Sequence, residues 1–181
     1  MPAGFARRLA AFLYDYAGIA LYLGVLALVS LYLYPDVQKL FSRSLVWSQL
    51  SGFLLVTLPI GLYYVISDSR LVGQSFGKKK LGLRVVSSGR PVSVPRSVLR
   101  TFLKFLPWEL AHGWIYRLAA SNGQDMTFSD IFLGACVYGL VLLYAGTALS
   151  PTKRTLYDIL SRTSVVRMEG SARSSDSRNT F

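Results

Sequence analysis

The sequence predicts an all-α integral membrane protein: a four-helix transmembrane bundle with a small cytoplasmic β-hairpin. The first observation is composition, because 52% of the 181 residues are hydrophobic, yet 20 Lys and Arg stand against nine Asp and Glu. The second is order, since apolar and basic residues alternate in blocks. Long apolar helices joined by short charged loops are typical of membrane proteins. We expect one transmembrane domain over 1–168 and a polar, Ser-rich, disordered cytoplasmic tail over 169–181.

Three apolar runs each predict a transmembrane helix, at about 9–34, 46–67 and 131–150. Each is long enough to cross a hydrocarbon core of about 30 Å. Pro59 lies inside the second run and removes one helical hydrogen bond, so we expect a bend near Leu55.

The third of the four predicted spans, about 100–118, is the weakest because it contains Glu109 and His112. It crosses only if the Arg and Lys residues at its ends reach the membrane interfaces.

The distribution of basic residues predicts the orientation. With four spans, segments 1–8, 68–104 and 151–181 share one side and hold 17 of the 20 basic residues. Loops rich in Lys and Arg stay in the cytoplasm. We therefore expect a multi-pass protein of the cell membrane with both termini cytoplasmic.

The segment 73–100 contains seven basic residues and no acidic one. Its apolar runs on either side of Ser87-Ser88-Gly89-Arg90 predict a short hairpin. We expect Lys78, Lys79, Lys80 and Arg84 to contact anionic lipid head groups or a partner protein. The expected partners are thus the lipid bilayer and its head groups, not nucleic acid.

Asp15 is the one charge inside the first run, and a carboxylate there is costly unless it is paired, protonated or hydrated. One interpretation is a cation or proton site, or a substrate contact. The other is a structural ion pair with a base such as Arg100 or Lys104. Arg8 lies two helical turns before Asp15, on the same face.

Glu109 and His112 are three residues apart, so they point the same way from the third helix. The alternatives are a proton relay or ion contact and a buried hydrogen-bonded pair. We expect no metal site, because di-metal bundles need a second such pair and further carboxylates.

No residue set supports catalysis, so we expect neither an enzyme nor a cofactor. The run from Gly73 to Lys80 has three residues between its glycines rather than the four of a P-loop.

Several segments together resemble the RDD family of small membrane proteins, named for one arginine and two aspartates. They are RRLAAFLYD, GQSFGKKKLGLRVVSSGRPVS, Arg100 and RTLYDILSRTSVV, between Ala6 and Val166. The resemblance implies that Arg8 and Asp15 are the first two of these residues and Asp158 the third, with Asp68 as the alternative. It also implies transport, with cation/proton exchange proposed for some members.

Two functions follow from these observations. The first is a small ion or solute transporter that uses Asp15, and the little space among four helices favours a homo-oligomer. The alternative is a non-catalytic membrane adaptor or assembly factor that binds lipids or a partner through its basic cytoplasmic face. We expect Asp158 to be an anchor that bonds Arg84 or Arg100 and fixes Thr163–Met168 against the hairpin, after a short helix begun by Pro151.

Overall fold

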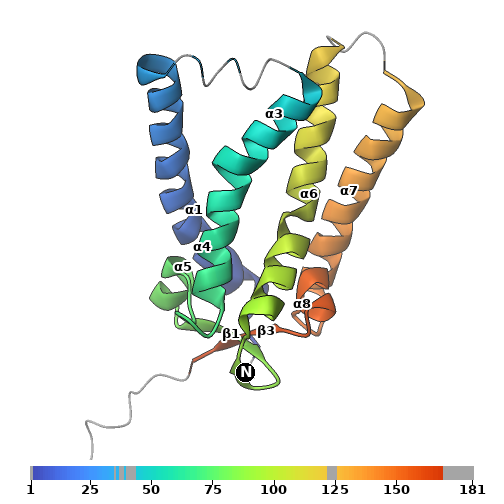
Figure 1. Ribbon diagram of the computed structural model, residues 1–181. Coiled ribbons are helices and arrows are strands. Elements are labelled where there is room, and N and C mark those ends of the chain that lie inside the picture. The colour runs from blue at the N-terminus through green and yellow to red at the C-terminus, as the bar shows by residue number, and fades with distance from the viewer. Residues whose placement is uncertain (1, 35, 37–38, 40–43, 122–125, 169–181) are drawn as a thin grey trace, which may run out of the picture.

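The computed structural model describes residues 2–34, 36, 39, 44–121 and 126–168. Four long helical segments stand on a small layer of short helices and strands, which we call the base (Figure 1). The elements in chain order are α1 (Phe5–Leu28), the π-helical turn η1 (Val29–Leu33), α3 (Leu45–Gly52), the π-helical turn η2 (Phe53–Thr57), α4 (Leu58–Asp68), α5 (Phe76–Lys80), β1 (Leu83–Ser87), β2 (Arg90–Pro91), α6 (Val94–Ala120), α7 (Phe128–Leu149), α8 (Leu156–Leu160) and β3 (Ser164–Arg167).

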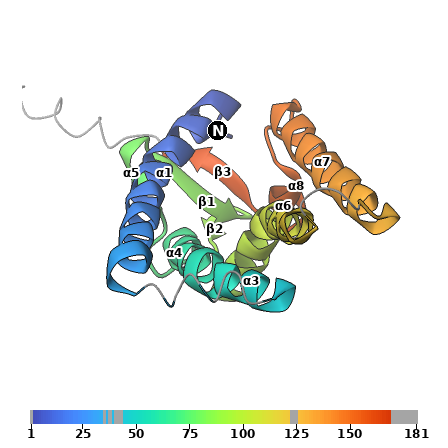
Figure 2. The ribbon, with the colours of Figure 1, turned by 90° about the horizontal axis from the view of Figure 1, so that it is seen from above.

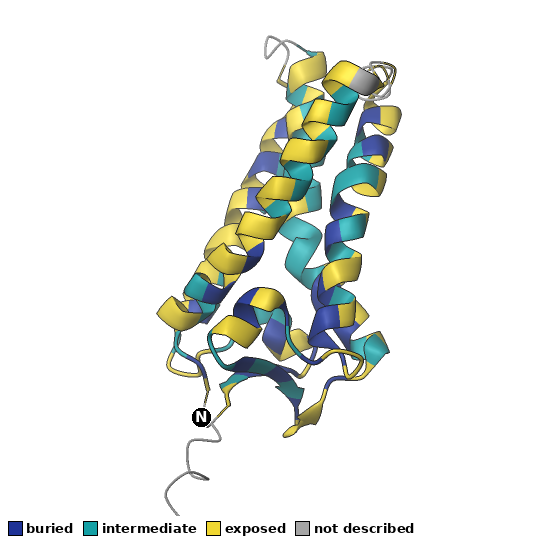
Figure 3. Ribbon diagram, turned by 90° about the vertical axis from the view of Figure 1, so that its left-hand side faces the viewer, coloured by how far each residue is buried: buried dark blue, intermediate teal, exposed yellow. Residues whose placement is uncertain are grey.

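Three of the long segments are long and apolar enough to cross a membrane: Phe5–Tyr32, Leu45–Asp68 and Phe128–Leu149. In their most apolar stretches only 6%, 28% and 17% of the residues are buried inside the protein. Their outer faces are largely exposed (Figure 3). Helices this apolar with so little cover from the chain itself require a hydrocarbon environment.

The fourth long segment, α6, has 27 residues but is not among the three apolar enough to span. It begins at Val94 rather than near 100 as predicted. Ser93 is extended and precedes it, and Pro95 lies in its first turn, where the missing N–H costs nothing. The helix is therefore longer than its apolar centre suggests.

Near Leu55, where we expected a bend, the second long segment contains the π-helical turn η2, which separates α3 from α4. Pro59 has no N–H to offer the Leu55 carbonyl four residues earlier. The hydroxyl of Tyr22 on α1 donates to that carbonyl at 2.5 Å. A neighbouring helix thus satisfies the group that proline leaves unpaired.

The same arrangement occurs between α6 and α7. Pro107 inside α6 frees the carbonyl of Leu103, and the Tyr144 hydroxyl of α7 donates to it at 2.5 Å. Each proline-containing helix is therefore joined to a neighbour by one tyrosine.

The base is built on a three-stranded antiparallel sheet in the order β2-β1-β3 (Figure 2). The predicted hairpin is present as β1 and β2, with Ser87 opposite Arg90. The predicted pairing of the C-terminal segment is also confirmed, since Leu83 lies opposite Arg167. Pro2 forms a bridge with Val166, so both ends of the described chain meet in the base.

The main apolar core lies in this base rather than between the long helices. Its buried members are Ala3, Ala11, Leu83, Val85, Val92 and Val165. Alternate residues of β1 point into it. The base therefore has a water-excluding core of its own beneath the long helices.

Candidate functional site

A buried carboxylate at the start of α8 joins three parts of the chain. Asp158 is fully buried and caps α8 by accepting from the Thr155 backbone N–H at 3.1 Å and from its hydroxyl at 2.7 Å. The same carboxylate forms ion pairs with Arg8 of α1 and Arg100 of α6. The capping box starts the helix at Leu156, five residues after the predicted start at Pro151.

The predicted anchor contact of Asp158 with Arg100 is present, and Arg8 takes the second place where Arg84 was the other candidate. Burial alone would raise the pKa of Asp158. The adjacent guanidinium groups of Arg100 and Arg8 outweigh it and lower the pKa to about 2. The carboxyl is therefore charged at neutral pH.

A second buried aspartate extends this set. Asp68, the last residue of α4, accepts from the Lys78 ammonium group at 2.6 and 2.8 Å. Its carboxylate also lies 3.6 Å from Arg100 Nε, so Arg100 stands between two aspartates. We call Arg8, Asp68, Lys78, Arg100 and Asp158 the ionic cluster; it joins α1, α4, α5, α6 and α8.

Asp15 is buried next to this cluster but has different partners. Its Oδ2 accepts from the Ser75 hydroxyl at 2.6 Å, and its Oδ1 accepts from the Gly77 N–H at 2.7 Å and the Tyr63 hydroxyl at 3.0 Å. No Lys or Arg of the described residues lies within ion-pair distance of it. Of the two alternatives for Asp15, an ion pair with a base such as Arg100 or Lys104 is absent, because uncharged donors of Ser75, Gly77 in α5 and Tyr63 in α4 satisfy both oxygens.

Gly77 explains how α5 comes close enough to reach Asp15. A Cβ at this position would lie 1.9 Å from the backbone carbonyl oxygen of Ala11. Only a residue without a side chain allows this approach of α5 to α1.

Glu109 and His112 lie in the half of α6 away from the base and do not share a partner. Glu109 accepts from Gln49 at 2.9 Å and from the Thr57 hydroxyl, both on the neighbouring segment. The Nδ1 atom of His112 lies 3.1 Å from the Trp108 carbonyl oxygen. Within the described residues, no group of three or more His, Cys, Asp or Glu could hold a metal ion.

The predicted basic contact residues separate into two groups. Lys79 and Lys80 are exposed on α5, and Arg84 is half-buried on β1. Lys78 instead points inward to Asp68. Three successive lysines on one helical turn cannot all face the same way.

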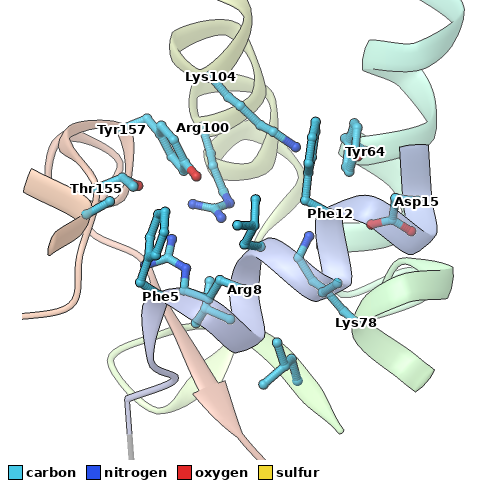
Figure 4. A pocket seen from close by; sticks show the side chains of 15 residues that line it. Phe5, Arg8, Phe12, Asp15, Tyr64, Lys78, Arg100, Lys104, Thr155 and Tyr157 are labelled. Carbon is cyan, nitrogen blue, oxygen red and sulfur yellow. The ribbon is translucent and has the colours of Figure 1, made fainter. Parts of the chain in front are cut away.

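The ionic cluster borders a cavity of about 180 Å³ at the base. Its charged lining residues are Arg8, Asp15, Lys78, Arg100 and Lys104. Figure 4 shows Lys104 and Arg100 entering it from α6, with Tyr64 and Lys78 opposite. The Lys104 ammonium nitrogen lies 3.3 Å from the centre of the Tyr64 ring, a cation–π contact.

Sequence reasoning missed the roles of Tyr64, Ser75 and Gly77, and treated Lys104 only as a partner for Asp15. Two signals were available. Thr155 and Asp158 have the spacing of a capping box, and Arg100 and Lys104 are four residues apart on one helix face. The contacts of Ser75 and Gly77 with α1 have no local pattern, because they connect residues about 60 positions apart.

The apolar helices and the buried charges at one end define the chain as a membrane protein with a polar base. The sequence model of the RDD family matches residues 2–162. The protein therefore belongs to the RDD family, as its sequence motifs indicate. The comparisons with curated proteins and with solved structures gave no match.

Proposed function

We propose that this RDD protein is a multi-pass transporter of a small ion or solute in the cell membrane, with four spans and both termini in the cytoplasm. One observation carries the proposal. Asp15 borders both the charged cavity at the base and a largely apolar cavity of about 480 Å³ between α1 and α4. A buried carboxylate between two cavities can interact with a charged solute that passes from one to the other.

Flux through proteoliposomes tests the proposal directly. The panel contains alkali cations with a proton gradient, as the RDD resemblance suggests, and small anions. Asp15→Asn keeps an oxygen acceptor for the Gly77 N–H and removes the charge, so flux should fall at least tenfold while the protein stays folded. Wild-type protein without flux for any member of the panel would overturn the proposal.

The four-span topology has its own support. Segments 1–8, 68–104 and 151–181 hold 17 of the 20 basic residues, against three elsewhere, which favours the same side of the membrane for all three segments. Single cysteines at Ser88 and Met126, in a Cys136→Ala background, test it in intact cells. An impermeant thiol reagent should label Met126→Cys and not Ser88→Cys. Equal protection of both would mean that α6 does not cross.

A non-catalytic adaptor is the second candidate. Its support is the outward position of Lys79, Lys80 and Arg90, all exposed at the base. This role predicts that Lys79→Met with Lys80→Met weakens binding to anionic vesicles. Flux is not part of it, so a wild-type protein that binds but does not transport would favour the adaptor.

A further inference from the structure

Three residues that line the cavity at the base have a donor that makes no hydrogen bond with the described residues. These donors include the buried Tyr64 hydroxyl and Arg100 Nε, which is 3.6 Å from Asp68 Oδ2, an ion pair beyond hydrogen-bond distance. Tyr64 is 1% exposed and Arg100 3% exposed, so water has little access to either. The Lys104 ammonium group has aromatic contacts but no hydrogen bond or ion pair with the described residues. Buried donors without acceptors are costly, which points to a missing ligand.

The charges around the cavity point to the sign of that ligand. Four cations line it: Arg8, Lys78, Arg100 and Lys104. Three carboxylates, of Asp15, Asp68 and Asp158, lie at or just behind the wall, so one positive charge is left over.

Lys104 is the cation of the cavity whose charge is not balanced by a carboxylate of its own. Asp158 is shared by Arg8 and Arg100, Asp68 is held by Lys78, and the oxygens of Asp15 are occupied by uncharged donors. Arg100 and Lys104 also repel each other as like charges one helical turn apart. An anion between them would remove that repulsion.

We propose that this cavity binds a phosphate group, held by Lys104, Arg100 Nε and the Tyr64 hydroxyl. Nη1 of Arg100 is already engaged by Asp158 and Thr163, and Nε makes no hydrogen bond, so Nε is the donor that we assign to the phosphate. Single donors from α4 and α6 suit a tetrahedral oxyanion with several acceptor oxygens better than a planar carboxylate.

The remaining walls indicate a phosphoester rather than a bare ion. Phe5, Leu9, Phe12, Leu83 and Val165 line the cavity beside its charged residues. They offer apolar contact to whatever the phosphate is attached to. The phosphate could belong to a lipid head group of the adjacent leaflet or to a soluble metabolite, because both present the same chemistry.

This inference names a ligand class for the cavity and rests on the proposed function only where it takes that ligand as the transported solute. Binding is therefore measured apart from flux. The melting temperature of the full chain in detergent is followed with rising inorganic phosphate, then glycerol phosphate, with chloride at equal ionic strength as the salt control. Wild type should show a saturable rise with both phosphates and none with chloride.

Two variants locate the site. Lys104→Met removes the uncompensated charge. It should raise the phosphate concentration at half-saturation about tenfold or more, since a charge-assisted hydrogen bond is lost. Tyr64→Phe removes one hydroxyl oxygen and should raise the phosphate concentration at half-saturation a few-fold. Arg70→Met, which makes the same charge change at an exposed basic residue outside the cavity, should match wild type. An equal phosphate response in Lys104→Met and wild type would overturn the site.

Nanodiscs distinguish the two sources of phosphate. A rise in melting temperature with phosphatidylglycerol over pure phosphatidylcholine, lost in Lys104→Met, with no response to soluble phosphates, would assign a lipid head group. A response to glycerol phosphate in pure phosphatidylcholine would assign a soluble ligand. No response to any phosphate would overturn the inference. Binding without flux would overturn transport and leave the phosphate site standing.

Discussion

Single residues decide how the base holds together, and Asp158 does so through charge. Its folded pKa of about 2 lies below its ordinary value of 3.8, so it adds stability above pH 4 that is lost as pH falls toward 2. The shift corresponds to about 2 kcal/mol at neutral pH. We predict that chemical unfolding in detergent shows this loss between about pH 4 and pH 2.

Asp158→Asn should abolish the loss of stability between about pH 4 and pH 2. It also removes the carboxylate with which Arg8 and Arg100 both form ion pairs. Breaking a buried ion pair from one side costs about 3 to 5 kcal/mol. The free energy of unfolding measured at pH 7 should fall by this amount. Asp36→Asn is the matched control, because the Asp36 pair with Lys39 is fully exposed. Equal stability of Asp158→Asn and wild type would contradict the anchor role.

Gly77 acts through space rather than charge. We predict that Gly77→Ala moves α5 away from α1 and weakens the N–H bond to Asp15, because its Cβ would overlap the Ala11 carbonyl. Overpacking of this kind costs about 1 to 3 kcal/mol. Thermal unfolding of Gly77→Ala is compared with that of Gly24→Ala, where a Cβ meets nothing within 4 Å. Similar melting temperatures for the two variants would count against the close approach.

At the scale of helices, the contact of Tyr144 with the Leu103 carbonyl stands in for the bond that Pro107 removes. Tyr144→Phe should therefore lower stability by about 1 kcal/mol. In a Pro107→Ala background the helix N–H returns, and the same change should be nearly neutral. This double-mutant cycle isolates the coupling. Tyr138→Phe, on an exposed tyrosine of the same helix, is the control.

The sequence predicts the helices better than their ends. Long apolar runs locate α1, the segment from α3 to α4, and α7, because a helix must be about 20 residues long to cross the hydrocarbon core and few other structures need apolar runs of that length. Helix ends depend on local caps, which is why α8 starts at Leu156, after its N-cap Thr155, and not at Pro151. The short helix α5 escaped prediction, since its five residues look like a basic loop and its stability comes from contacts with α1.

The partners in the site were harder to predict for the same reason. Asp15 and Asp158 could be singled out as unusual charges, but the sequence does not say which base each one meets. Arg8 lies on the same helix as Asp15 and nevertheless pairs with Asp158. Long-range geometry, set by how the base folds, decides between such alternatives. The predicted tail at 169–181 lies outside the described residues.

At the scale of the whole molecule, β3 completes the sheet of the base by pairing with β1. We predict that a chain ending at Met168 unfolds at the same temperature as the full chain, since it keeps every described element. A chain ending at Thr163 loses β3 and the cover over Leu83 and Val85, and should be much less stable. Melting curves in one detergent compare the two. Equal stability would mean that the core does not need this strand.

The pairing of Arg8 with Asp158 spans 150 positions. A ribosome adds about 5 to 20 residues each second, so Arg8 leaves it roughly 8 to 30 seconds before its partner does. Arg100 likewise has no ion pair with Asp158 until that residue has been synthesised. Through most of its synthesis, the nascent chain thus carries arginines at the membrane surface without this counter-charge. Synthesis of α8 supplies this counter-charge, and only then can the first helix be joined to the end of the described chain through Asp158.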